Sequence, residues 1–248
     1  MANYLFGEAY RIIRKKSMYL YFGAFAFLYL LLVFMRAGTG NADTQILQDA
    51  EVLSSFFPAV VGGYLFAAIY TDDLNAKNLG TLIGFGMGKA KIVIAKLVLV
   101  LAFGALFFGL IPLFLWAANT LFGGSIPSSA WQVLYAWAAK SFLETLAFSA
   151  VSAIVVYGLQ RATFGMVTYL LLALGIISQL MSALLNWDMI SSVLPGLSQH
   201  LMSGISFRVM VGIVSESMPL EPLVEYLVYV AAAAALSVLA FRKKELEF

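Results

Sequence analysis

Two charged side chains inside a long hydrophobic stretch, Lys140 and Glu144, have the clearest capacity for chemistry. Their spacing puts them one turn apart on the same side of a helix, where an ammonium and a carboxylate can neutralise each other. A charge buried alone in a membrane is costly, so each should face the other or a polar cavity. Two interpretations stay open: the pair belongs to a translocation path or subunit interface, or it fixes helix packing. A proton relay through Glu144 is possible, but it would have only one acidic residue and no intramembrane histidine.

A second candidate is the glycine-rich stretch GFGMGK, from Gly84 to Lys89. Glycines followed by a lysine can cradle a phosphate, but the Walker pattern needs a glycine five residues before the Gly-Lys pair and a serine or threonine after it. Ile83 and Ala90 hold those positions. We therefore predict a glycine-rich turn between two short helices.

Other catalytic and metal chemistry lacks its residues. The chain has no cysteine, which excludes disulfides, thiolate metal sites and cysteine nucleophiles. A single histidine, His200, excludes a two-histidine metal motif within one chain and is expected to form a hydrogen bond near the membrane interface. The serines lack the G-x-S-x-G setting of a hydrolase nucleophile. We expect no catalytic residue, no metal site and no cofactor in this chain.

The composition is that of a membrane protein. Of 248 residues, 62% are hydrophobic and only 11% are charged, against roughly 25% charged in soluble domains. We predict an all-α integral membrane protein in which residues 1–248 form a single transmembrane domain. Stretches long enough to cross a membrane predict six spans, at residues 17–35, 53–70, 92–121, 130–157, 164–185 and 223–241.

Three other segments complete the predicted organisation. Residues 3–16 alternate apolar and charged positions with helical spacing, which favours an amphipathic helix lying in the membrane interface. Residues 71–91 form a polar loop between the second and third spans. Residues 186–222 are apolar but broken by prolines and glycines, so we expect short re-entrant or interfacial helices there.

The positions of the basic residues predict the orientation. The expected inner segments hold 12 of the 15 lysines and arginines, and acidic residues prevail in the outer segments. Since cytoplasmic loops are enriched in lysine and arginine, both termini are predicted to be cytoplasmic.

With these features the chain resembles the permease subunits of the type 2 ATP-binding-cassette exporter family. The resemblance covers the whole length in architecture: an elbow helix, six spans and a broken outer segment before the last span. Its most specific part is the 71–91 loop and the start of the third span. The matching positions there are Asp72 or Asp73, Gly80-Thr81, Leu82-Ile83, Gly86 to Gly88, Lys89 and Lys96. Glycine stands where the family often has proline.

The resemblance implies that this loop forms a coupling helix docked on a separate ATPase subunit. The expected docking residues are Asp72, Asp73, Lys77, Leu79, Gly80, Thr81, Leu82, Ile83 and Phe85. It further implies two copies of the ATPase, which would hold ATP and magnesium, and a second permease subunit, identical or homologous. The expected activity is export of an amphipathic or hydrophobic substrate, such as a peptide, an antibiotic or a lipid-like molecule, across a bacterial plasma membrane, as in antibiotic resistance.

Two other classes of function remain as alternatives. A self-sufficient secondary transporter or channel would use Lys140 and Glu144 and need no partner ATPase. An intramembrane enzyme is disfavoured because a nucleophile, base or metal set is missing. Transport by the chain alone, without ATP, would decide for the first alternative.

Overall fold

The computed structural model describes residues 1–36, 42–71, 78–122, 128–187, 192, 196–217 and 220–243. These residues form helices and no strand. In chain order the helices are α1 (Ala2–Ile13), α2 (Lys16–Arg36), α3 (Ala42–Phe57), η1 (Pro58–Gly62), α4 (Gly63–Phe66), η2 (Ala67–Thr71), α6 (Asn78–Gly84), α7 (Lys89–Leu121), α8 (Ser128–Leu159), α9 (Ala162–Ala173), α10 (Ile176–Leu185), η3 (Leu197–His200), α12 (Met202–Val214) and α13 (Leu220–Lys243).

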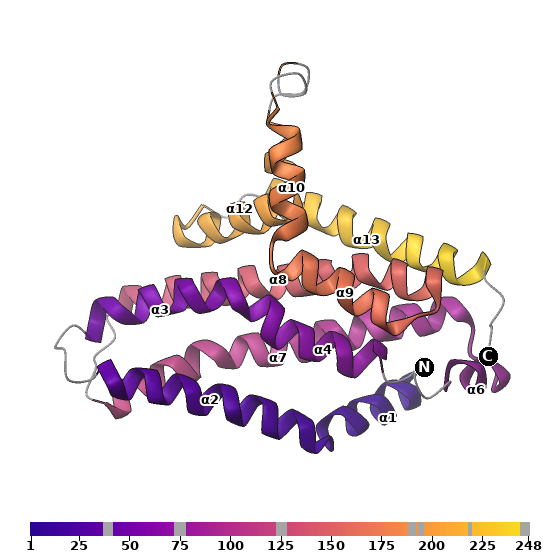
Figure 1. Cartoon of the computed structure of the whole chain (residues 1–248), viewed down its shortest axis with the longest axis horizontal. Coiled ribbons are helices and arrows are strands. Elements are labelled where there is room, and N and C mark those ends of the chain that lie inside the picture. The colour runs from indigo at the N-terminus through magenta and orange to yellow at the C-terminus, as the bar shows by residue number, and fades with distance from the viewer. Residues whose placement is uncertain are drawn as a thin grey trace.

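The long helices lie roughly side by side along the longest axis of the molecule (Figure 1). The N-terminus, α6 and the last turn of α13 lie at one end, which we call the α6 end. Helix α10 differs from the others, because it projects sideways from the bundle and none of its residues is buried.

Five helical stretches are long and apolar enough to cross a membrane, and a bent pair of helices can count as a sixth. The five are Lys16–Met35, Ala50–Thr71, Lys89–Leu121, Ala130–Leu159 and Leu220–Lys243. An all-helical chain with five to six apolar helices is thereby confirmed and is compatible with a multi-pass membrane protein. The side on which the termini lie and the placement of α1 in the interface stay predictions.

The predicted fifth span, 164–185, is not one straight helix. It divides into α9 and α10, which are bent by 61° at a short break. Gly175 in that break has a φ of +74°, in the left-handed region that glycine adopts without the steric cost of a Cβ. The left-handed conformation of Gly175 therefore ends α9, and α10 leaves the bundle from this point.

Helix α8 is the centre of the bundle and contacts α3, α7, α9, α12 and α13. Besides Glu144, its buried polar side chains are small and follow one another at helical spacing: Ser141, Thr145, Ser149 and Ser152. Small side chains let neighbouring backbones approach closely, as is common between membrane helices. The polar stripe of α8 therefore serves packing.

Helices α9 and α12 pack against successive parts of α8. Near the α6 end, a Cβ on Gly165 of α9 would lie only 2.1 Å from Val156 of α8, so these helices touch closely. Farther along, Ser206 of α12 donates a hydrogen bond to Glu144 of α8. Near the start of α8, the Gln132 amide donates to a carbonyl at the end of α12. The point along α8 at which α12 replaces α9 as the neighbouring helix therefore lies beside Glu144.

The second apolar stretch runs through α3, η1, α4 and η2 and contains two π-helical turns. The first begins at Pro58, which lacks the N–H that a regular helix would use there. The Tyr169 hydroxyl donates a hydrogen bond to the Pro58 carbonyl at 2.7 Å. A Cβ on Gly62 would lie 2.1 Å from the same hydroxyl, so the contact with α9 depends on glycine at this position.

Candidate functional site

The predicted docking loop is described from α6 onward. Asp72, Asp73 and Lys77 lie outside the described residues, and for Leu79 and Thr81 the backbone alone is described. Gly80 belongs to α6 and is half-buried. The remaining predicted residues can be placed in full.

The glycines after α6 build the turn that ends this helix. The Gly86 amide donates to the Ile83 carbonyl at 2.9 Å, and the Met87 amide to the Leu82 carbonyl at 3.1 Å. Gly86 has a φ of +82°. This pair of bonds around a left-handed glycine is a Schellman motif, which satisfies carbonyls at a helix C-terminus. The glycine cluster thus has a structural explanation that needs no bound phosphate.

Three of the four apolar residues expected to touch a partner have described side chains, and they do not share one face. Leu82 and Ile83 are half-buried and pack against the main hydrophobic core. Phe85 points outward and is 86% exposed. A side chain of this size gains most from being covered, so Phe85 is the best candidate for a contact with another protein.

A buried cluster of charges holds the helix that leads into this loop. Lys96 of α7 is 1% exposed, and its Nζ lies 2.5 Å from the Ile69 carbonyl and 3.4 Å from Glu8 Oε2. Arg11 of α1 lies 2.6 Å from Glu8 and donates a weaker bond of 3.4 Å to the Ala68 carbonyl. Cations at a helix C-terminus satisfy its last carbonyls and complement its dipole. The cluster therefore joins α1 and α7 to the end of η2.

The sequence analysis missed this cluster. It treated residues 3–16 only as an amphipathic helix in the interface, and Lys96 only as a matching position at the start of the third span. In the structure, the exposed apolar side chains of α1 are Phe6, Tyr10 and Ile13. A lone acid on a basic helix and a lysine inside a hydrophobic run were signals that could have suggested an ion pair.

The second candidate site is the pair inside α8. Lys140 Nζ lies 2.9 Å from Glu144 Oε1, and both side chains are largely buried. The Ser206 hydroxyl donates to the same Glu144 oxygen at 3.0 Å. The Trp137 ring lies 5.8 Å from the Lys140 ammonium, within reach of a cation–π contact. The pair is neutralised internally and tied to α12.

A polar pocket of about 190 Å³ adjoins this pair. Its wall includes the end of α9 from Leu172 to Gly175, and also Ser178 of α10 and Ser203 of α12. The C-terminus of α9 and the N-terminus of α12 therefore meet beside an ammonium and a carboxylate. Helix ends carry partial charges, and interrupted helices of this kind form binding sites in many transporters.

A third group of polar residues lies between η3, α12 and α13. His200 Nδ1 lies 2.6 Å from Glu225 Oε1, and Arg208 forms an ion pair with the other oxygen of the same carboxylate. The hydrogen bond expected of His200 is thus to Glu225. Among the described residues, no three acids, histidines or cysteines are grouped to hold a metal ion.

Comparison of the chain with known protein families, with characterised proteins and with solved structures found no match. Function therefore has to be argued from the residues and their geometry.

Proposed function

We propose that this chain is the membrane-spanning permease subunit of an ATP-driven exporter, with catalysis of ATP hydrolysis in a partner chain. The observation that carries the proposal is the short helix α6, which stands between two apolar helices and displays Phe85. Its Schellman turn sets the position of this exposed ring directly after α6. Such an element suits a rigid contact through which a soluble partner could move the bundle.

The docking residues of the proposal are those of the 71–91 loop, with Phe85 as the central contact. An aromatic ring within a polar rim is the usual anatomy of an interface hot spot. ATP and magnesium would be bound by two ATPase subunits. The substrate would be amphipathic or hydrophobic, because the apolar helices offer few charges to a strongly polar one.

The proposal includes a second permease subunit, identical or homologous. The projecting helix α10 supports it, because several large apolar side chains are exposed there and none of the described residues covers them. They are Leu180, Met181, Leu184 and, just after the helix, Trp187. A second chain packed against α10 would cover them and could enclose a path between the subunits.

The experiment tests whether binding of the ATPase and export both depend on Phe85. Phe85→Asp should abolish co-purification with the ATPase and stop export, while insertion into the membrane stays normal. Phe85→Leu keeps an apolar contact and is the matched control. Leu82 and Ile83 are less suitable targets, because their replacement would also disturb core packing. Normal export by the Phe85→Asp variant would refute docking on α6.

The second candidate function is a self-sufficient secondary transporter or channel. The observation that favours it is the polar pocket beside Lys140 and Glu144 at the break after α9. Reconstitution of the purified chain in liposomes distinguishes the two functions. Transport by this chain alone without ATP would support the second function and exclude the first.

A further inference from the structure

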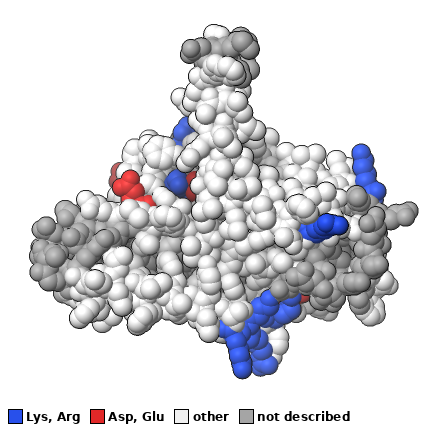
Figure 2. Space-filling model, in the orientation of Figure 1, with Lys and Arg blue, Asp and Glu red and all other residues white. Residues whose placement is uncertain are grey.

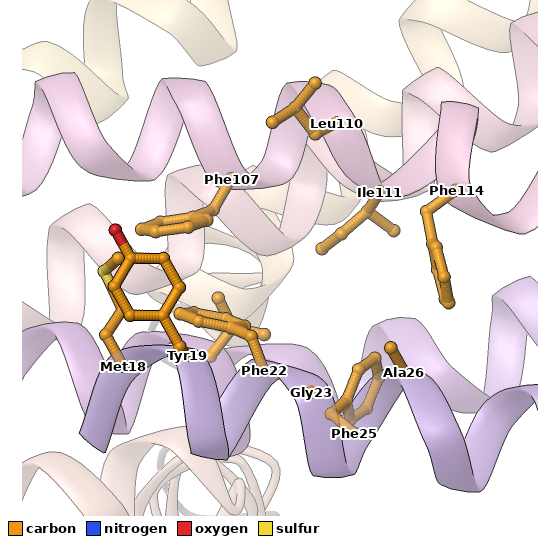
Figure 3. A pocket seen from close by; sticks show the side chains of 11 residues that line it. Met18, Tyr19, Phe22, Gly23, Phe25, Ala26, Phe107, Leu110, Ile111 and Phe114 are labelled. Carbon is orange, nitrogen blue, oxygen red and sulfur yellow. The ribbon is translucent and has the colours of Figure 1, made fainter. Parts of the chain in front are cut away.

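An apolar pocket of about 430 Å³ lies between α2 and α7 (Figure 3). Phe22, Gly23 and Ala26 of α2 form one wall. Phe107, Ile111 and Phe114 of α7 form the facing wall. Among the described residues that line the pocket, Tyr19 alone carries a polar group in its side chain. A space with so few hydrogen-bonding groups has little to hold water.

Phe22 stacks on Phe107 across the two helices, with ring centres 4.5 Å apart, and the pocket is open beside this contact. Gly23 is exposed, and a Cβ built on it would meet no atom within 4 Å. The neighbouring side chains Leu20, Phe27 and Leu28 are exposed as well, so this face of α2 borders the surroundings of the bundle. For a helix that spans a membrane, those surroundings are lipid hydrocarbon.

Basic side chains stand at one end of this pocket. Arg14 and Lys16 are exposed at the junction of α1 and α2, just before the first lining residue, Met18. Figure 2 shows lysine and arginine side chains gathered there, at the bottom of the view. The Arg14 guanidinium lies 4.6 Å from the centre of the Tyr10 ring, which holds it beside α1. From Lys16 to Ala26 the helix rises by roughly 15 Å.

The exposed apolar side of α1 sets the depth of these charges. Phe6, Tyr10 and Ile13 share one side of the helix and are exposed. Aromatic and apolar side chains on a helix with basic neighbours favour a position at the headgroup boundary. Arg14 and Lys16 would then lie at the level of phosphate groups, with the pocket beginning directly below them in the hydrocarbon.

We infer that this pocket binds one acyl chain of an anionic phospholipid, whose headgroup phosphate is held by Arg14 and Lys16. Hydrocarbon gains little by leaving a bilayer for an apolar pocket, so shape and the headgroup charge must supply the selectivity. A basic residue at an anionic membrane surface improves binding by about fivefold. The inference does not depend on a partner ATPase or on the direction of transport.

The test measures lipid retention by the full chain, purified in detergent, by native mass spectrometry. We expect each chain to keep one phosphatidylglycerol under conditions that remove the others, and to keep phosphatidylcholine much less. Arg14→Gln combined with Lys16→Gln should lower phosphatidylglycerol retention by roughly 25-fold, about fivefold for each charge. It should leave phosphatidylcholine unchanged.

Matched leucine substitutions test the pocket itself. Gly23→Leu fills it and should abolish the retained lipid, whereas Gly109→Leu adds the same side chain to an exposed site of α7. A Cβ meets no atom within 4 Å at either position, so both variants should fold, which thermal melting checks. Ala26→Leu is a second filling variant and should act like Gly23→Leu.

Three results would overturn the inference. The first is equal retention of phosphatidylglycerol by the Gly23→Leu and Gly109→Leu variants. The second is equal retention of the two lipids by the wild-type chain. The third is loss of a dimer in Gly23→Leu without a change in bound lipid, which would assign this face to a second copy of the chain.

Discussion

Replacing Gly62 by alanine should destabilise the bundle, whereas the same change at the next residue should not. A Cβ at position 62 would lie 2.1 Å from Tyr169 Oη and 2.6 Å from Thr145 Oγ1. At Gly63 the nearest atom lies at 3.7 Å, an ordinary van der Waals distance. Because both glycines are in the same helical stretch, the helix-propensity gain of alanine, about 1 kcal/mol, is common to both variants.

The expected difference can be estimated from the contacts. Overpacking costs about 1–3 kcal/mol, and the bond from Tyr169 to the Pro58 carbonyl, worth about 1 kcal/mol, would be lost as the ring moves. After subtraction of the propensity gain, Gly62→Ala should be about 2 kcal/mol less stable than the wild type. Gly63→Ala should be up to about 1 kcal/mol more stable. For a chain of this size the melting temperatures should then differ by roughly 10 °C.

Thermal unfolding of the purified variants in detergent, followed by circular dichroism, measures this difference. Tyr169→Phe in the Gly62→Ala background removes the hydroxyl from the closest contact and should recover part of the loss. Equal melting temperatures for Gly62→Ala and Gly63→Ala would refute the reasoning. The reasoning would also be refuted if Tyr169→Phe lowered stability by the same amount in the wild type and in the Gly62→Ala variant.

Three further predictions concern the charges and one strained residue. Lys96→Met should cost about 2–4 kcal/mol, because the Ile69 carbonyl loses a charged donor; a melting temperature equal to that of the wild type would contradict this. Glu144→Gln should lower the yield of folded protein by leaving Lys140 unpaired, and Lys140→Met in the same chain should restore it; size-exclusion profiles in detergent would show whether it does. Glu216 ends α12 with a φ of +56°, so Glu216→Gly should raise stability by about 1 kcal/mol and Glu216→Ala should not, as thermal melting can establish.

The sequence predicted the all-helical architecture with its long apolar helices because that architecture depends on local properties. A bilayer requires long apolar helices with internally bonded backbones, so five to six such helices could be recognised from runs of apolar residues alone. The glycine-rich turn after α6 was predictable for a similar reason. Its geometry depends on the left-handed conformation of Gly86 and on bonds to residues three and five positions earlier.

The sequence by itself determined which residues are hydrophobic and where charges interrupt them, and it predicts the membrane side on which the basic residues lie. Only the tertiary structure decided which charges meet. Glu8 and Lys96 are 88 residues apart yet share one cluster, and the break after α9 lies beside Glu144, where α12 also contacts α8. The pairing of distant residues depends on how the helices pack, and a uniformly apolar sequence carries little information about that packing. For this reason the long apolar helices could be predicted from the sequence, whereas the bend after α9, the charge cluster, the polar pocket and the apolar pocket at Gly23 required the folded chain.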